Sequence, residues 1–155
     1  MDKAVRQGDS AIALRLAFYG GLVVCVLDGL GQRPSIAAMA VGACVLVAAV
    51  VLRVWSQLVL GAAWSTRVRV EPQQPLVTAG PYRLVRHPAY LALIIFYLGA
   101  VIAFRSISGL MVFALGLAPA ICHRTALEET ALASHFGEQY LRYAAATKRI
   151  LPHLF

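Results

Sequence analysis

Four apolar stretches, each long enough to cross a lipid bilayer, constrain the fold of this chain more than any other feature. Their approximate limits are residues 11–30, 36–62, 88–104 and 106–122. A spanning helix needs roughly 17–25 predominantly apolar residues, and each stretch meets that length. Lipid offers the backbone no hydrogen-bonding partner, so each stretch must satisfy its own amide groups, as a helix does. The sequence therefore predicts an all-α integral membrane protein with about four transmembrane helices.

The amino-acid composition also indicates that the chain is surrounded by lipid. Hydrophobic residues make up 60% of the 155 residues, charged residues make up only 14%, and the mean hydropathy is +0.73. A soluble domain of this length could not bury so much apolar surface, and the chain has room for a single domain, over residues 1–155. A signal peptide is the alternative for the first stretch. Asp28, Gln32 and Arg33 follow it instead of a small-residue cleavage site, so we expect a retained span.

Basic residues lie mainly on one side of the predicted bundle. That side holds Lys3, Arg6, Arg67, Arg69, Arg83, Arg86, Arg124, Arg142, Lys148 and Arg149, whereas the other side holds Arg33 and Arg105. Because positive charge is retained on the cytoplasmic side, we expect both termini in the cytoplasm and the spans in the cell inner membrane. The net charge of +7 is spread between the apolar stretches, which favours anionic lipid headgroups over nucleic acid as the partner.

The chain changes character after the fourth stretch. Residues 123–146 are polar enough to leave the bilayer, and apolar side chains recur there at helical spacing. We expect a C-terminal cytoplasmic or interfacial helix, weakened locally by Gly137, that lies on the membrane or caps the bundle.

Polar side chains meet the apolar spans at two places. One is segment 80–90, before the third span, and the other is segment 123–129, after the fourth. Arg105 followed by Ser106 indicates a tight turn between these spans. The two spans then form an antiparallel hairpin, and its open ends bring the two polar segments side by side.

The residue types at these ends suit a functional site. Pro88 fits the first turn of a helix, and His87 directly precedes it, where the helix dipole favours an anion. Tyr90 adds a hydroxyl, and Arg124 and Glu128 are i,i+4 neighbours on one helix face. Charged residues this close to a bilayer suggest a functional site. The alternative is that Arg, His and Tyr form an interfacial belt at the level of the lipid headgroups. No His or Cys cluster has metal-ligand spacing, so no metal site is predicted.

At these residues the chain resembles the isoprenylcysteine carboxyl methyltransferases and related membrane methyltransferases, including phospholipid N-methyltransferases. The matching motifs are Gly-Pro-Tyr-Arg at 80–83, Arg-His-Pro-Ala-Tyr at 86–90, the Glu128–Glu129 pair and Tyr-Leu-Arg-Tyr at 140–143. The resemblance covers about residues 55–155. One departure is Ala92, where many members have glycine.

The resemblance implies S-adenosyl-L-methionine as the methyl donor, bound on the cytoplasmic side within residues 76–155 and covered by the C-terminal segment. The cofactor-binding residues that it implies are Gly80, Pro81, Tyr82, Arg86, His87, Tyr90, Glu128 and Glu129. Arg124 and Glu128 match a pair close to the reacting groups and are the expected catalytic residues. The expected substrate-binding residues are Tyr140, Tyr143 and Arg149.

The expected reaction is methyl transfer to a lipophilic small molecule or lipidated substrate that arrives among the membrane lipids. Transfer from a sulfonium is an in-line displacement, so alignment and exclusion of water supply most of the acceleration. A carboxylate acceptor needs no general base. A hydroxyl or amine acceptor needs one, and Glu128 or His87 is the candidate.

Two alternatives remain open. Within the same fold, the acceptor is the amine nitrogen of a phospholipid. Outside enzymes, the chain is a small transporter or scaffold, for which Arg53 is the one good candidate for a polar group within the spans. A Rossmann-type methyltransferase is excluded, because no strand leads into a glycine-rich turn and a helix. The sequence does not predict the oligomeric state.

Overall fold

The computed structural model describes residues 2–61 and 75–151, with side chains from residue 8 onward. Its long helices are α1 (Asp2–Leu30), α2 (Ile36–Leu60), α3 (Pro88–Phe104) and one continuous helix from Ile107 to Phe136. That last helix comprises α4 (Ile107–Val112), a π-helical segment η3 (Phe113–Leu117) and α5 (Ala118–Phe136). The short elements are a 3₁₀ turn, η2 (Gly80–Arg83), and α6 (Glu138–Ala146).

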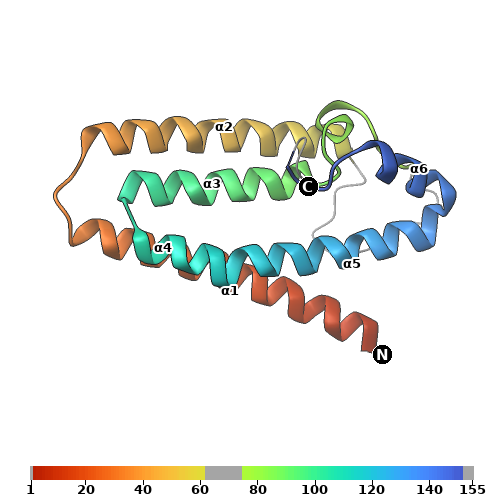
Figure 1. Ribbon diagram of the computed structural model, residues 1–155, viewed down its shortest axis with the longest axis horizontal. Helices are drawn as coiled ribbons and strands as arrows, with labels where there is room; N and C mark the ends of the chain where they lie inside the picture. The colour runs from red at the N-terminus through yellow and green to blue at the C-terminus, as the bar shows by residue number, and fades with distance from the viewer. Residues whose placement is uncertain (1, 62–74, 152–155) are drawn as a thin grey trace.

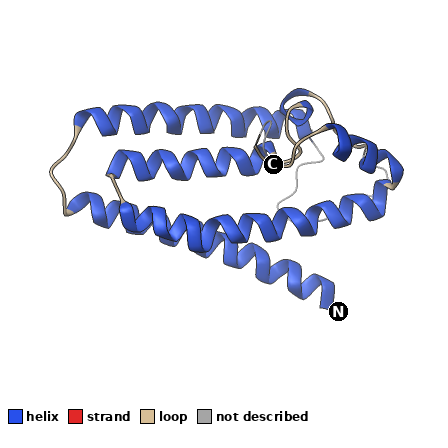
Figure 2. Ribbon diagram, in the orientation of Figure 1, coloured by secondary structure: helices blue, strands red, loops and turns tan. Residues whose placement is uncertain are grey.

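The described residues form a helical bundle without a named strand, as Figure 2 shows. Within residues 2–61 and 75–151, three helices are long and apolar enough to cross a membrane: Gly8–Leu30, Ile36–Leu60 and Ile107–Phe136. α3 is apolar throughout but shorter, with 17 residues. The predicted all-α integral membrane fold is confirmed.

Two helix limits differ from the sequence-based expectation. α1 begins at Asp2 instead of near residue 11, because a helix continues into polar residues that hydropathy does not mark. The C-terminal helix expected over 123–146 is present in α5 and α6, but its first part is continuous with the fourth span. The fourth span runs without a break to Phe136, and Gly137, with φ 54° and ψ −129°, ends it before α6 begins. The expected end of the second span at residue 62, together with Arg67 and Arg69, lies outside the described residues.

α2 and α3 pack closely because small residues line their contact. The buried residues of α2 are Gly42, Ala49 and Ser56, which recur every seven residues along one face. A Cβ atom at Gly42 would lie 2.5 Å from the Cβ of Ala103, so only glycine permits this approach. In a bilayer, where apolar side chains gain little by leaving lipid, such close backbone packing is the main source of helix association.

The buried core lies between α1, α3 and the η3–α5 segment. Its members are Cys25, Tyr97, Leu117, Ile121 and Ile150, the last from the C-terminal segment. The outer faces of the bundle are apolar as well: Leu16 is 69% exposed and Leu58 is 75% exposed. In water these side chains would be unfavourable, whereas against lipid chains they are solvated.

The expected tight turn between the third and fourth spans is present at Arg105 and Ser106. Arg105 adopts the left-handed conformation (φ 52°) and ends α3, and the Ser106 hydroxyl accepts a hydrogen bond from the Gly109 amide to cap α4. The same hydroxyl donates to Asp28 near the end of α1, at 2.7 Å. Figure 1 shows α3 returning beside α2, so that α3 begins and α5 ends at one end of the bundle, with η2 and α6.

The fourth span changes its helical pattern in its middle. Across η3 the hydrogen bonds widen by one residue, and the Ala118 amide bonds to the Phe113 carbonyl. Pro119 follows at once and has no amide hydrogen with which to continue an α-helical ladder. Single π-helical turns of this kind often occur near functional sites.

Candidate active site

The start of α3 is shaped by η2 and by the C-terminal segment. Backbone amides of Arg86 and His87 donate to the carbonyls of Lys148 and Arg149, at 2.7 and 3.0 Å, so segment 85–87 lies beside segment 147–149. His87 then occupies the N-cap position of α3 without a side-chain cap bond, and Pro88 opens the helix. The His87 ring is therefore available to contacts across the bundle.

Those contacts come from α5, which carries acidic and basic residues on one face. Arg124 is 4% exposed, and its Nε lies 3.6 Å from Oε1 of Glu128, one helical turn later. From α3, the Tyr90 hydroxyl donates to Glu128 Oε1 at 2.6 Å. Arg124 Nε in turn donates to the Tyr90 hydroxyl at 3.0 Å. The result is a chain from guanidinium to phenol to carboxylate that joins the first turn of α3 to α5.

Glu128 is less enclosed than its partners. Its side chain is 25% exposed, whereas the side chains of Arg124 and His87 are each 5% exposed. Its Oε2 atom lies 3.7 Å from His87 Nδ1, which is too long for a strong hydrogen bond. One oxygen of this carboxylate is therefore positioned by Tyr90, and the other has His87 as a more distant neighbour.

Glu129 forms a second cluster that ties three segments together. Arg86 Nε donates to its Oε1 atom at 2.8 Å, and His87 Nε2 lies 3.3 Å from the same oxygen. Arg149 donates to its Oε2 atom from Nε at 3.0 Å and from Nη2 at 2.5 Å. The hydrogen bond to Glu129 raises the pKa of the Arg149 guanidinium. His87 thus stands between the two carboxylates, one from each cluster.

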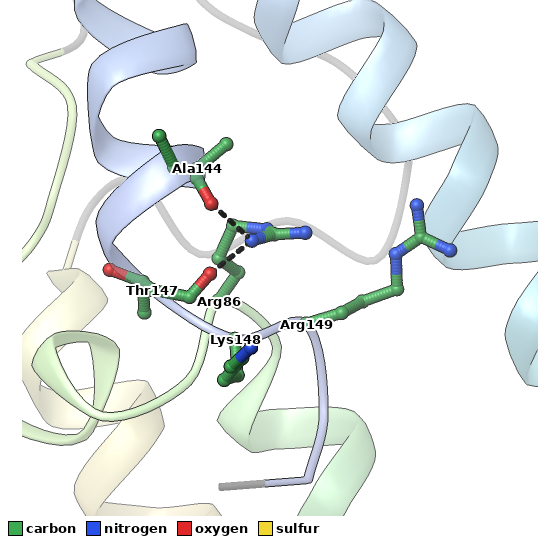
Figure 3. A pocket seen from close by; sticks show the side chains of 6 residues that line it. Arg86, Ala144, Thr147, Lys148 and Arg149 are labelled. Carbon is green, nitrogen blue, oxygen red and sulfur yellow. Dashed lines mark hydrogen bonds between the residues drawn. The ribbon is translucent and has the colours of Figure 1, made fainter. Parts of the chain in front are cut away.

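A pocket of about 340 Å³ opens beside this second cluster. Its lining residues are Arg86, Ala144, Ala145, Thr147, Lys148 and Arg149. Figure 3 shows Arg86 donating to the carbonyls of Ala144 and Thr147, while Arg149 extends away from them towards α5. The pocket is bordered by three cationic side chains and by the end of α6.

Three tyrosines join α6 to the η2 turn. The Tyr143 hydroxyl donates to the Tyr82 carbonyl at 2.6 Å. Burial raises the pKa of the Tyr82 hydroxyl to about 12 and that of the Tyr140 hydroxyl to about 12, so both are neutral donors at physiological pH. The Tyr140 hydroxyl is buried near the Arg86 guanidinium, and among residues 8–61 and 75–151 its proton has no acceptor. An unpartnered buried donor of this kind calls for an explanation, such as a bound ligand.

The residues selected from the sequence separate into three sets. The structure brings seven of them into one contact network: Arg86, His87, Tyr90, Arg124, Glu128, Glu129 and Arg149. Tyr82, Tyr140 and Tyr143 lie at its edge, on the α6 side.

Gly80 and Pro81 form the third set, and their contacts belong to the packing of the η2 turn. Gly80 adopts φ 58°, and a Cβ atom there would lie 2.9 Å from the Val59 side chain, so its close approach is to α2. Pro81 is buried in η2. Their expected cofactor contacts stay predictions.

Two contacts were not anticipated from the sequence. Arg124 Nη1 donates to the Ser10 hydroxyl of α1 at 3.1 Å, across 114 positions of sequence. Arg53, singled out above as a candidate transport residue, donates from Nη1 to the Ala89 carbonyl at 3.0 Å and so joins α2 to α3. No local sequence motif predicts either contact, because each depends on how separate helices pack against one another.

Comparison with known proteins points to one family. The model of the isoprenylcysteine carboxyl methyltransferase family matches residues 40–134. The uncharacterized protein YpbQ of Bacillus subtilis is 28% identical over 133 residues, which cover 83% of this chain and 78% of that protein.

Two plant proteins match a shorter region. A probable protein-S-isoprenylcysteine O-methyltransferase of Oryza sativa is 33% identical over 88 residues, 57% of this chain and 46% of the relative. Protein-S-isoprenylcysteine O-methyltransferase A of Arabidopsis thaliana is 33% identical over 86 residues, 56% of this chain and 44% of the relative. The chain thus spans less than half the length of these two plant proteins. The family match includes both ends of the hairpin that carries the clusters, and the chain therefore belongs to the isoprenylcysteine carboxyl methyltransferase family, whose members are methyltransferases.

Proposed function

We propose that this protein transfers a methyl group from S-adenosyl-L-methionine to a carboxylate or hydroxyl of a lipophilic acceptor at the cytoplasmic face of the membrane. The observation that carries the proposal is the Arg124–Tyr90–Glu128 chain at the open end of the α3–α5 hairpin. It holds a guanidinium and a partly exposed carboxylate of α5 beside the first turn of α3. A lipophilic acceptor would reach such a place with its apolar part still in lipid.

The residues beside this chain fit the proposed donor. S-adenosyl-L-methionine carries a carboxylate and an ammonium group, and when bound it would supply an activated methyl group on a sulfonium centre. Arg86, Lys148 and Arg149 border the pocket and suit its carboxylate, since guanidinium and ammonium groups bind carboxylates through charge-assisted hydrogen bonds. The partly exposed Glu128 suits its ammonium group. The unpartnered Tyr140 hydroxyl is a further donor near the same cluster.

The main task of the side chains would be to align the acceptor with the methyl donor. Arg124 would bind the acceptor carboxylate, neutralise its charge and orient it, and Tyr90 holds the Arg124 Nε atom in place for this role. For a hydroxyl acceptor, Glu128 would receive the proton, because its side chain is partly exposed and its Oε2 atom lies 3.7 Å from His87, too far for a strong hydrogen bond. The C-terminal segment, joined to the start of α3 by two backbone hydrogen bonds, would cover the site and exclude water.

The distribution of charge supports a cytoplasmic location. Described basic residues at the site end include Arg83, Arg86, Lys148 and Arg149, whereas the opposite end carries Arg33 and Arg105. This asymmetry follows the retention of positive charge on the cytoplasmic side of inner membranes.

Labelled S-adenosyl-L-methionine tests the proposal. Purified protein in nanodiscs is incubated with total membrane extract and the labelled product is identified, while calorimetry measures binding of S-adenosylhomocysteine. Glu128→Gln is expected to abolish labelling with the melting temperature unchanged. Glu138→Gln, at a glutamate whose side chain is 87% exposed on α6, should label like the wild type.

Three outcomes would overturn parts of the proposal. Absence of S-adenosylhomocysteine binding at millimolar ligand removes the donor. Retained labelling by Glu128→Gln removes that residue from the site. A labelled phospholipid amine, instead of an ester or ether product, moves the acceptor to nitrogen.

A further inference from the structure

The Arg124 guanidinium is held from a helix that lies outside the family match. Its Nη1 atom donates to the Ser10 hydroxyl at 3.1 Å, and this hydrogen bond is buried. Ser10 is itself only 7% exposed. The family match begins at residue 40, so α1 lies outside the matched residues.

The position of Ser10 on α1 follows from how that helix packs. Residues at steps of three or four along α1 form the face that meets the bundle: Ser10, Leu14, Ala17, Gly21, Cys25 and Asp28. Gly21 lies so close to α3 that a Cβ atom there would overlap the Tyr97 ring. Near the other end of α1, Asp28 accepts a hydrogen bond from the Ser106 hydroxyl. This face is therefore fixed against α3 and α4, and Ser10 is its polar member at the site end.

Two opposite parts of the same guanidinium are thereby restrained. On one side, Nε donates to the Tyr90 hydroxyl and lies 3.6 Å from Glu128. On the other, Nη1 donates to Ser10. A guanidinium is planar, so contacts at Nε and at Nη1 from different helices define the plane in which its remaining N–H groups point. An acceptor carboxylate bound by Arg124 would take its orientation from that plane.

We infer that Ser10 is a positioning residue for Arg124 and that the site end of α1 forms one side of the acceptor subsite. This inference rests on the proposed role of Arg124 in holding the acceptor. Loss of the Ser10 hydroxyl removes a restraint on the guanidinium plane that comes from α1. Binding of the acceptor and its alignment for transfer should then weaken, whereas the donor pocket, which is formed by Arg86 and segment 147–149, should keep its affinity.

Three serine variants in nanodiscs test the inference by initial rates. Ser10→Ala should lower kcat/KM for the acceptor by roughly ten- to a hundredfold, and S-adenosylhomocysteine affinity should stay within about twofold. Ser10→Thr keeps the hydroxyl and should restore most of the activity. Ser134→Ala removes an exposed serine hydroxyl of α5 that donates to the Ala131 carbonyl and serves as the matched control. Wild-type kinetics for Ser10→Ala, or an equal loss in Ser10→Thr, would overturn the inference.

A second readout does not depend on turnover. In protein labelled with ¹⁵N-arginine, the Arg124 side-chain signals, assigned by their absence in Arg124→Lys, should report hindered rotation of the guanidinium. Ser10→Ala should speed that rotation, and Ser10→Thr should not. If the wild type shows no methyl transfer but these signals respond as described, the proposed function fails and the positioning contact stands. Signals that are identical in all three proteins would refute the contact itself.

Discussion

Arg149→Gln is expected to loosen the C-terminal segment where it lies beside the start of α3. The substitution removes the charge that binds Glu129 through Nε and Nη2, at 3.0 and 2.5 Å, and leaves a shorter, neutral polar side chain. The backbone hydrogen bonds of Arg86 and His87 to Lys148 and Arg149 remain possible. The change therefore tests how much the ion pair contributes to holding the segment in place.

The magnitude follows from exposure and from the remaining partners of Glu129. A hydrogen bond to a charged group contributes about 1.5–3 kcal/mol when buried, while exposed ion pairs contribute about 0–1 kcal/mol. The side chains of Arg149 and Glu129 are 29% and 13% exposed, so the pair lies between these limits. Glu129 also keeps Arg86 and His87 and is not left as an unpaired charge. We expect a loss of about 2 kcal/mol in the local opening free energy, or about a thirtyfold increase in opening.

Hydrogen–deuterium exchange in nanodiscs, read by mass spectrometry on peptides covering residues 83–90, measures this opening. The amides of Arg86 and His87 exchange when the segment separates from α3, so their exchange rates should rise by about the same factor. Arg142→Gln is the matched control. It breaks an Arg–Glu pair of α6 whose side chains are 81% and 87% exposed and should change exchange less than about twofold. Equal and small changes in both variants would refute the assignment of the docking energy to the Arg149–Glu129 pair.

Two further predictions concern the bundle itself. Gly42→Val should lower the melting temperature, at a cost of about 1–3 kcal/mol, because its Cβ atom would collide with Ala103, whereas Gly20→Ala, with nothing within 4 Å, should leave it unchanged or raise it. Equal effects would contradict the close α2–α3 contact. Ser106→Ala should cost about 1–2 kcal/mol, because the cap on Gly109 and the hydrogen bond to Asp28 are both lost. Thermal unfolding in detergent measures both, and a Ser106→Ala variant as stable as wild type would rule out the capping role.

The sequence located the two sides of the site because they lie at the ends of one hairpin. The limits predicted for the third span from hydropathy coincide with those of α3, Pro88–Phe104. Polar residues, His87 and Arg105, directly flank this apolar stretch at both ends. The turn at Arg105 then placed His87 and Tyr90 opposite Glu128, as the contacts show. Local sequence signals and one topological inference, the hairpin turn, were therefore sufficient to predict that segments 80–90 and 123–129 lie side by side.

Contacts between segments far apart in sequence could not be predicted in the same way. Hydropathy marks where a helix can lie in lipid but does not mark where its hydrogen bonding ends, so α5 continued to Phe136. The pairing of Val85 with Lys148 depends on the path of the chain after Gly137. The contact of Ser10 with Arg124 depends on the packing of α1 against α5. No residue pattern within either segment encodes its partner.

The π-helical segment in the middle of the fourth span has a consequence for angular phase. Each residue of an α-helix advances the side-chain direction by about 100°, and the wide turn at Phe113–Leu117 inserts an offset between the two halves of the helix. The first half directs Gly109 towards Cys25, and the second directs Arg124 towards Tyr90. A regular helix would have to compromise one of these directions. The wide turn thus accommodates one residue more than a regular α-helical turn would between Gly109 and Arg124, and it lets both side-chain directions hold within one continuous helix.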